Sequence, residues 1–527
     1  MMSGWKIIII GLAFIVINLY SLLVGKYQFF PYNQISDLKQ YFIKSLQVDY
    51  FYFLEKNSPK SQAERLNLAT QDSSRKNQFS SASDVIEKIE GLIQRSNPRV
   101  PDRDINLPEP SAYVLQRSVQ AGNPLRVYVH APNGAGVEIF RLGREKTLIK
   151  KLDPVNPTKQ SAQYSDEVGL RWQPNLLVPT SGLKSGYYLL ELKDNKTASI
   201  HQLPFIVSPV STHKVAFIAA TYTWAAFNNF AGKNFYFDTQ ASRSTLEKRA
   251  ALNGILEAIG RPPLTISLPI ARVDQFESPI MDKKPNVPHY SHLLRSAWNL
   301  TAFADEHNVD YGVYTDEDLD HLSIRRGGAL WDAEIIVFGP HTEYWTKNMV
   351  DVMRAYLAKG GKVVFAGGNT AFFEVQADST KIVRKRHMDS VISKGLAGTS
   401  TTDLADPMFA PYKVEKPEHW IFSGTSVKKG GLFGRESLNH REEIKAKGAS
   451  GWEADQLGIA SKDFDLIARG ENIRGQADMV FRDTPTGGWV FNASSIPFAG
   501  ALAIDPVISQ IMLNLLSGGP DKARETR

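Results

Sequence analysis

The chain of 527 residues contains no cysteine. This absence excludes thiolate nucleophiles, thiolate zinc sites, disulfides and lipoprotein acylation, but it does not decide the compartment, because reducing and oxidising surroundings both tolerate it. Neither sign of charge predominates strongly, since the chain has 61 Lys and Arg and 55 Asp and Glu. The basic residues do not gather into a stripe beyond Arg384, Lys385 and Arg386, so we expect no nucleic-acid partner.

Familiar enzyme motifs are missing as well. The sequence has no Gly-x-Ser-x-Gly elbow, no His-Glu-x-x-His and no Gly-rich phosphate loop with Lys. A cluster of three adjacent acids resembles a metal site by composition: Asp316, Glu317 and Asp318. Acids that follow a strand more often begin a helix, however, and we favour that interpretation here.

A long apolar run lies near the N-terminus, from residue 7 to residue 25 (IIIIGLAFIVINLYSLLVG). As a helix with a rise of about 1.5 Å per residue it reaches roughly 28 Å, close to the thickness of a bilayer core. A cleaved signal peptide has a shorter apolar region and a small-residue exit, which residues 22–25 lack. The sequence therefore predicts an uncleaved single-pass anchor (residues 1–26) in the inner membrane, with the bulk of the chain on its periplasmic or extracellular side.

Four further regions follow the anchor. Residues 27–108 combine a juxtamembrane helix with a polar stretch that has too few large apolar side chains to offset chain entropy, which predicts a tether. Residues 109–210 contain strand-length runs such as LRVYVHA, GVEIFRL and GYYLLELK separated by turns, which predicts an immunoglobulin-like β-sandwich. Residues 211–520 are predicted to form an α/β domain, and residues 521–527 a polar tail.

The α/β domain is predicted from continuous apolar strands at 214–220, 334–339 and 362–366, of the kind buried on both faces of a parallel sheet. Between the last two, Thr346 is a good N-cap, an apolar stripe at helical spacing follows, and Gly360 ends the helix. This order of strand, helix and strand favours a doubly wound sheet.

Polar and aromatic residues follow each of these three strands. Ligands bind at the carboxyl ends of the strands in open α/β sheets, so we expect the three segments to line one pocket. The predicted substrate-binding residues are Tyr222, Trp224, Asn228 and Asn229 after the first strand, Tyr344 after the second and Gly368 after the third.

His341 and Glu343 are the strongest candidates for a catalytic or metal-binding pair. Because they are two residues apart in an extended segment, their side chains project to the same side, with Cα atoms about 7 Å apart. Such a pair can share one cation or one substrate proton, and we expect it to face open space at the mouth of the sheet. The alternative is structural: Glu343 then favours the dipole of the helix that begins near Thr346, and His341 only hydrogen-bonds a loop.

Six segments, in order, resemble the large (beta) subunit of N,N-dimethylformamidase and its relatives. They are TYTWAAFNNFAGKNFY, VDYGVYTDEDLD, FGPHTEYWTKNM, GGKVVFAGGNTAFFEV, HWIFSGT and GGWVFNASSIPFAGAL, and the likeness runs from about Leu125 to Leu516. The resemblance implies a β-sandwich followed by a glutamine-amidotransferase-like α/β domain. It also implies hydrolysis of a small amide at a mononuclear iron that two tyrosines and a glutamate bind.

The resemblance assigns residues to this site. Glu343 falls on the glutamate that binds the metal, His341 on a nearby acid–base group, and Glu453 on a second acid. The tyrosines depart from the family pattern, because Phe227 stands where one is expected and residues 266–273 contain no other. Loss of two ligands weakens an iron site, so the cofactor is left open between iron, another divalent metal and none.

We therefore expect an envelope-facing hydrolase of amide C–N bonds, with His341, Glu343, Asn369 and Glu453 as its catalytic residues. A cation or the imidazole activates water, and Asn369 with the backbone of residues 367–368 stabilises negative charge. The alternative is a catalytically inactive protein that binds or scaffolds envelope polysaccharide or another polymer. The expected partners are the membrane and a small amide or envelope glycan, and a homo-oligomer is left open.

Overall fold

The computed structural model describes residues 103–165, 169–228, 235, 270–271, 293–378, 381–388, 395–401, 409–438, 447–458, 461–473 and 476–520. The chain divides into two units, and all of these residues lie in the unit formed by 100–240 and 265–527. The predicted anchor, most of the predicted tether and the polar tail lie outside the described residues. Within the described ranges, no helix is long and apolar enough to cross a membrane.

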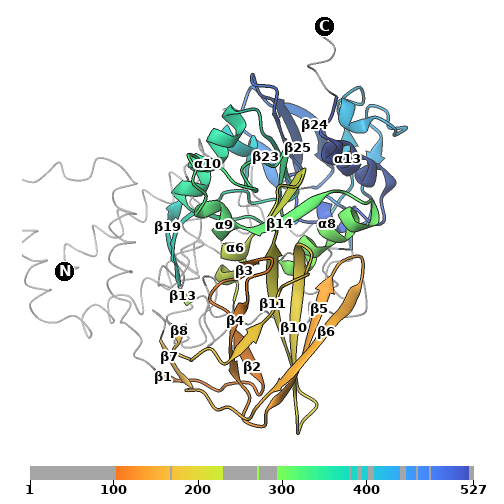
Figure 1. Ribbon diagram of the computed structural model, residues 1–527. Helices are drawn as coiled ribbons and strands as arrows, with labels where there is room; N and C mark the ends of the chain where they lie inside the picture. Colours follow the sequence, from red (N-terminus) through yellow and green to blue (C-terminus); the bar gives the residue numbers. More distant parts are fainter. Residues whose placement is uncertain are drawn as a thin grey trace, which may run out of the picture. The chain divides into compact units, whose positions relative to one another are not determined.

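The first part of the described chain (residues 103–208, the sandwich region) contains two antiparallel-rich sheets, drawn in orange and yellow in Figure 1. The larger has the order β3 (Ser118–Gln120), β11 (Ile200–Ser208), β10 (Gly186–Asp194), β5 (Ala135–Leu142), β6 (Lys146–Val155). The smaller has the order β2 (Ser111–Tyr113), β4 (Leu125–His130), β9 (Leu176–Val178). A third small sheet joins β1 (Arg103–Asp104), β7 (Gln163–Ser165) and β8 (Gly169–Leu170).

The two larger sheets share one core. Residues alternate between buried and half-buried along β5, as a strand with one face on a core requires. Ile139 of β5 and Leu190 of β10 belong to the same buried cluster as Val127 of β4, so the sheets pack face to face. The three quoted strand-length runs are confirmed as β4, β5 and β10.

The second part (residues 215–520, the α/β region) is built on a nine-stranded mixed sheet. Its parallel half is β14 (Tyr311–Thr315), β12 (Val215–Ala219), β15 (Ile335–Phe338), β17 (Lys362–Phe365) and β26 (Trp489–Asn492). Its antiparallel half is β25 (Asp478–Asp483), β24 (Asp465–Gly470), β21 (Tyr412–Val414) and β22 (Leu432–Phe433). The sheet is therefore mixed, where the sequence predicted a doubly wound parallel one.

Helices cover both faces of this sheet. Along β12, Phe217 joins the cluster that contains α8 (Leu294–Glu306) and α13 (Pro506–Ser517), whereas Ile218 joins the cluster that contains α10 (Lys347–Ala358). Successive side chains of a strand point to opposite faces, so the fully buried, apolar strand β12 contributes side chains to both clusters. Thr346 accepts a hydrogen bond from the backbone N–H of Met349, which confirms the predicted start of α10.

Shorter elements complete the α/β region. They are α6 (Thr221–Ala226), α9 (Asp316–Asp320), α12 (Phe498–Ala501), η2 (Trp420–Phe422), a sheet of β13 (Ile270–Ala271), β19 (Lys381–His387), β18 (Phe373–Ala377) and β16 (Tyr344–Trp345), and the pair β20 (Thr399–Thr401) and β23 (Asp455–Leu457). In α9, Thr315 and Asp318 form a capping box. The acids at 316–318 therefore begin a helix, as the sequence interpretation favoured.

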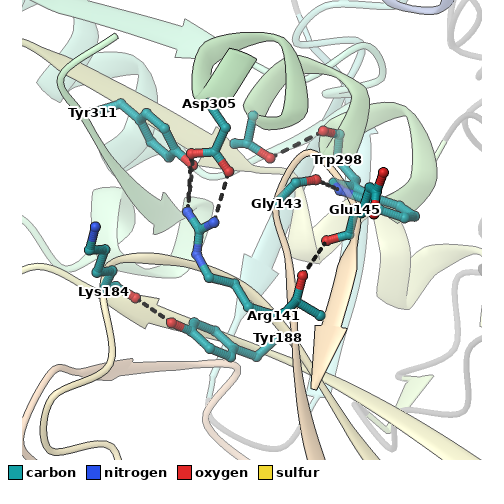
Figure 2. A network of polar contacts seen from close by, with 10 residues as sticks. Arg141, Gly143, Glu145, Lys184, Tyr188, Trp298, Asp305 and Tyr311 are labelled. Atoms are coloured by element: carbon teal, nitrogen blue, oxygen red, sulfur yellow. Dashed lines mark hydrogen bonds and ion pairs between the residues drawn. The ribbon is translucent and has the colours of Figure 1, made fainter. Parts of the chain in front are cut away.

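A polar network joins the two regions (Figure 2). Arg141 of β5 donates to both oxygens of Asp305 near the end of α8, at 2.8 and 3.2 Å, and also to the hydroxyl of Tyr311 at 3.0 Å. Trp298 of α8 donates its indole N–H to the carbonyl of Gly143. The sandwich region thus packs on α8 and β14, through apolar contacts and a charged pair.

Candidate functional site

The candidate site lies where β15 and β17 end. The parallel pairing of these strands extends past their ends to His341 and Gly368. A Cβ atom on Gly367 would lie 1.6 Å from the carbonyl oxygen of Pro340, and one on Gly368 would lie 2.0 Å from that of Glu453. Only glycine allows three backbone segments to approach this closely, which explains the Gly-Gly pair after β17.

His341 lies between two glutamates. Its Nε2 is 3.2 Å from Oε2 of Glu343, and its Nδ1 is 3.2 Å from Oε2 of Glu453. Asn369 donates its side-chain N–H to the same Oε2 of Glu453 at 2.9 Å. The structure therefore brings together all four residues that the sequence and the resemblance proposed as catalytic.

The expectation that His341 and Glu343 face open space is wrong. The side chain of His341 is 0% exposed and that of Glu343 is 4% exposed, whereas that of Glu453 is 20% exposed. The ring of Phe227 packs edge-on against His341, with 5.5 Å between ring centroids. The pair is therefore covered by packing, and Glu453 is the member of the cluster that reaches the surface.

The charge state of His341 follows from these neighbours. Burial by itself lowers the pKa of an imidazole, but the negative charges of Glu453 and Glu343 outweigh it and raise the pKa of His341 to about 9. At neutral pH the ring is then an imidazolium, with one ring nitrogen 3.2 Å from a carboxylate oxygen of each glutamate. Such a ring stabilises negative charge, but it cannot serve as the base that activates water.

Asp455 is a further acid that the sequence analysis missed. It is fully buried, and its carboxylate accepts from the backbone N–H of Asn369 at 3.1 Å and of Thr370 at 3.5 Å. Burial raises the pKa of Asp455 to about 7, although the two hydrogen bonds lower it. The Glu-x-Asp spacing at 453–455 is the same i, i+2 signal that singled out His341 and Glu343.

Backbone strain gathers at the same place. Among the described residues other than glycine, six have positive φ, and five of them flank this cluster: Asn369, Ala371, Trp452, Glu453 and Ser494. The backbone N–H of Asp455 donates to the carbonyl of Ser494, which ties these segments together. Left-handed conformations of such residues cost free energy and persist where the surroundings impose them, often at functional sites.

Two backbone N–H groups in the segment predicted to stabilise an oxyanion already have partners, and the rest of that assignment stays a prediction. The backbone N–H of Gly368 donates to Pro340 O at 3.1 Å, and that of Asn369 donates to Asp455. These donors are already engaged inside the fold. His341 instead places a positive charge beside Glu453, with its Nδ1 3.2 Å from Oε2.

The predicted aromatic contacts lie in packed surroundings. Tyr222 donates its hydroxyl to Asp320 at 3.0 Å, Trp224 packs against Tyr187, and Tyr344 stacks on Phe373. Asn228 is buried at the end of α6, and Asn229 lies outside the described residues. Their role as substrate contacts stays a prediction. From this segment it is Thr223 that reaches the site, where its hydroxyl accepts from the backbone N–H of Glu343 at 3.0 Å.

The side chains found here do not fit an iron site of two tyrosines and a glutamate. Phe227, at the expected tyrosine position, carries no oxygen, and both nitrogens of His341 face carboxylates. Over the part of the chain that the structure describes, no group of three or more His, Asp or Glu side chains is arranged to hold a metal ion. Glu343 as a metal ligand stays a prediction from the resemblance, and no chemical step below passes through a metal.

Comparison with known proteins supports the resemblance. The chain is 21% identical over 436 residues to the N,N-dimethylformamidase beta subunit of Paracoccus aminophilus, a match that covers 66% of this chain and 54% of that subunit. The match thus spans about half the length of this curated relative. A cytoplasmic protein of Salmonella typhimurium with a solved structure is 14% identical, covers 42% of this chain and 85% of its own, and has a TM-score of 0.28, too low to indicate a common fold.

The family model described as N,N-dimethylformamidase beta subunit-like, C-terminal matches residues 136–511. This range begins in β5 of the sandwich region and ends in α13, so it contains every residue of the candidate site. Because the match extends over well more than half of the chain, the protein belongs to the N,N-dimethylformamidase beta subunit-like, C-terminal family.

Proposed function

We propose that the protein hydrolyses the C–N bond of small amides and that Glu453 is the base that activates water. The observation that carries this proposal is the position of Glu453. Its Oε2 is held by His341 and Asn369, at 3.2 and 2.9 Å, while its side chain reaches the surface. A carboxylate fixed in this way is available to a solvent molecule and a substrate, whereas Glu343 and His341 are not.

The reaction follows from the charges in the cluster. Glu453 takes a proton from water as the water oxygen bonds to the amide carbon, and the carbonyl electron pair moves onto oxygen. The imidazolium of His341 lies behind Glu453 and does not contact the substrate, and its positive charge favours the negative charge that develops on the other side of Glu453. Glu453 then returns the proton to the amide nitrogen, the C–N bond breaks with its electron pair on nitrogen, and the products are a carboxylic acid and an amine.

The buried position of His341 strengthens its effect on charge. Water is largely excluded from the ring, so its field is screened less than that of an exposed cation. The carboxylate of Glu343 lies 3.2 Å from the far nitrogen, Nε2, and this ion pair holds the ring with its Nδ1 3.2 Å from Glu453. We therefore assign Glu343 the role of a positioning residue in this mechanism, and Glu453 the role of catalytic residue.

The test is Glu453→Gln in the full chain, assayed with formamide and N-methylformamide. Glutamine keeps the shape of the side chain but cannot take a proton, so kcat/KM is expected to fall by about 100-fold or more. The control is Glu471→Gln, because Glu471 pairs with Lys413 on the surface at 3.5 Å and is expected to leave the rate unchanged. Full activity in Glu453→Gln contradicts the proposal.

A binding protein without catalysis is the second candidate. The observation that favours it is the burial of His341 and Glu343, together with Phe227 in place of the expected tyrosine. In that case the buried cluster only orders the loops at the edge of the sheet, and the surface above it binds an envelope polymer. A folded, full-length protein that hydrolyses none of the tested amides but sediments with envelope polysaccharide supports this candidate.

We also propose, separately, that the protein faces the cell envelope. It depends on the apolar segment 7–25, whose length suits a bilayer. The full chain is then expected to stay in the membrane pellet after an alkaline carbonate wash. Release into the supernatant contradicts the anchor without affecting the proposal for Glu453.

A further inference from the structure

A groove of about 570 Å³ opens on the sandwich region, between strands of its two larger sheets. Residues 150–156 and 158, in and after β6, line one side, and residues 175–177 and 179, in and beside β9, line the other. Each of these strands is the last of its sheet, and no described strand pairs with its outer edge (Figure 1). Backbone N–H and C=O groups at such an edge are a template for a further strand.

The pairing of β6 with β5 shows which side chains of β6 face the space between the sheets. Lys150 lies opposite Ile139 and Leu152 lies opposite Val137, and both of these β5 residues are buried in the core that the two sheets share. Directly opposed residues lie on the same face of a sheet. Lys150 and Leu152 therefore project to the core side of β6, at the border where the sandwich is open.

The charge of this edge is positive. The segment from residue 146 to residue 159 contains four lysines and one aspartate. Lys151 projects to the other face of the sheet, where it pairs with Glu138 at 2.7 Å, whereas no carboxylate of the described residues pairs with Lys150. A second copy of this edge would bring like charges together, but a strand with acidic side chains is attracted to it.

Apolar side chains accompany this charge. Three of the nine large apolar side chains exposed in the described part of the chain lie on these two strands, namely Leu148, Ile149 and Leu177, which are 44%, 43% and 61% exposed. Leu152 and Leu176 line opposite sides of the groove and pack in part against the core. An apolar side chain placed between them extends that core and is stabilised by burial.

We propose that this groove binds an acidic peptide in an extended conformation, which adds to β6 as a further strand. Side chains on one face of a strand recur every second residue, so the peptide places a carboxylate beside Lys150 and an apolar side chain beside Leu152. Its backbone pairs with the open edge of β6, which is the part that an acidic polysaccharide cannot supply. The inference does not depend on hydrolysis at Glu453, and either proposal can fail without the other.

The test uses a fluorescein-labelled peptide in which Thr-Glu-Thr-Val is repeated twice, titrated with the full chain and followed by fluorescence anisotropy. Wild type is expected to bind it, and Lys150→Glu is expected to weaken binding by about tenfold or more, because like charges then face each other. Lys150 is exposed, so this replacement leaves the core intact. The matched control is Lys193→Glu, with the same change of charge at an exposed position of β10 outside the groove. It is expected to leave the affinity unchanged.

Two further ligands separate strand addition from attraction by charge alone. The same peptide with every backbone amide N-methylated keeps its carboxylates but cannot donate to the edge of β6, and it is expected not to bind. Equal affinity for both peptides overturns the proposal, as does a wild type that binds neither or an equal effect of the two lysine replacements. Polygalacturonate that binds as tightly as the unmodified peptide, and is lost in Lys150→Glu, also overturns it, because the groove then takes an acidic glycan.

Discussion

The two regions of the molecule each bury a histidine, and they leave it in opposite charge states. His130 of the sandwich region is 3% exposed, its Nδ1 accepts from the backbone N–H of Gln160 at 3.0 Å, and its ring lies against Trp172. Burial lowers the pKa of His130, despite Glu109 nearby, so the ring is neutral at pH 7. In the α/β region, two carboxylates raise the pKa of His341 to about 9.

In the proposed mechanism, this difference separates a histidine that only packs from one that takes part in the site. Burial alone favours the neutral ring, which costs little to pack, and His130 follows that rule. An imidazolium between two glutamates costs desolvation of three charges, and such arrangements are found preferentially at functional sites. Backbone conformation points the same way, because the described residues of the sandwich region have positive φ only at glycine, whereas five strained non-glycine residues flank the His341 cluster.

The largest expected effect comes from replacing each histidine by glutamine and comparing the losses in stability. His341→Gln removes the cation between Glu343 and Glu453, so the free energy of unfolding at pH 7 is expected to fall by roughly 3–5 kcal/mol. His130→Gln removes a neutral acceptor and is expected to cost about 1 kcal/mol. Urea denaturation of both variants measures the two losses, and equal losses would show that the cluster around His341 holds no buried cation.

The fold could be predicted where a local pattern decides it. The apolar strands β12, β15 and β17 and the capped helix α10 lie where the sequence placed them. Strand β6 was missed because most of its residues, including Lys150 and Lys151, are exposed, so it lacks the alternation that marks a half-buried strand. The pairing of β17 with β26 could not be predicted either, because sequence patterns do not reveal which distant strands become neighbours.

The site was predictable to the same degree. The i, i+2 spacing of His341 and Glu343 is local, and their contact at 3.2 Å agrees with it. Their burial was not predictable, because it depends on Phe227 and on loops from other parts of the chain. The approach of Glu453 was expected only from the family resemblance. Asp455 was not predicted as a site residue, because its partner Asn369 is remote in sequence.

Asp455 tests the same contrast between a charged and a neutral buried group, through a smaller effect that depends on pH. Its pKa is 3.8 when unperturbed and about 7 in the fold, so it stabilises the fold fully below about pH 4, and this contribution is lost as the pH rises through 7. Between pH 6 and pH 8 the loss is expected to be about 1.4 kcal/mol. Asparagine does not ionise, so wild type is expected to lose stability relative to Asp455→Asn over this range, as measured by urea denaturation at several pH values. A difference that stays constant with pH contradicts the raised pKa.

The smallest expected effect concerns the network that joins the two regions. Arg141 and Asp305 are each about one-fifth exposed and form a two-point ion pair, so water screens them more than the buried cluster at His341. A double-mutant cycle with Arg141→Met and Asp305→Asn is expected to give a coupling of about 1 kcal/mol, with Tyr311 retained in both variants. The matched surface pair Lys413–Glu471, at 3.5 Å and more than two-fifths exposed on both sides, is expected to couple by less than about 0.5 kcal/mol. A coupling at Arg141 no larger than at Lys413 would mean that apolar packing holds the two regions together, through the buried cluster that includes Leu142, Tyr187 and Phe303. Charge would then contribute to stability mainly at the candidate site.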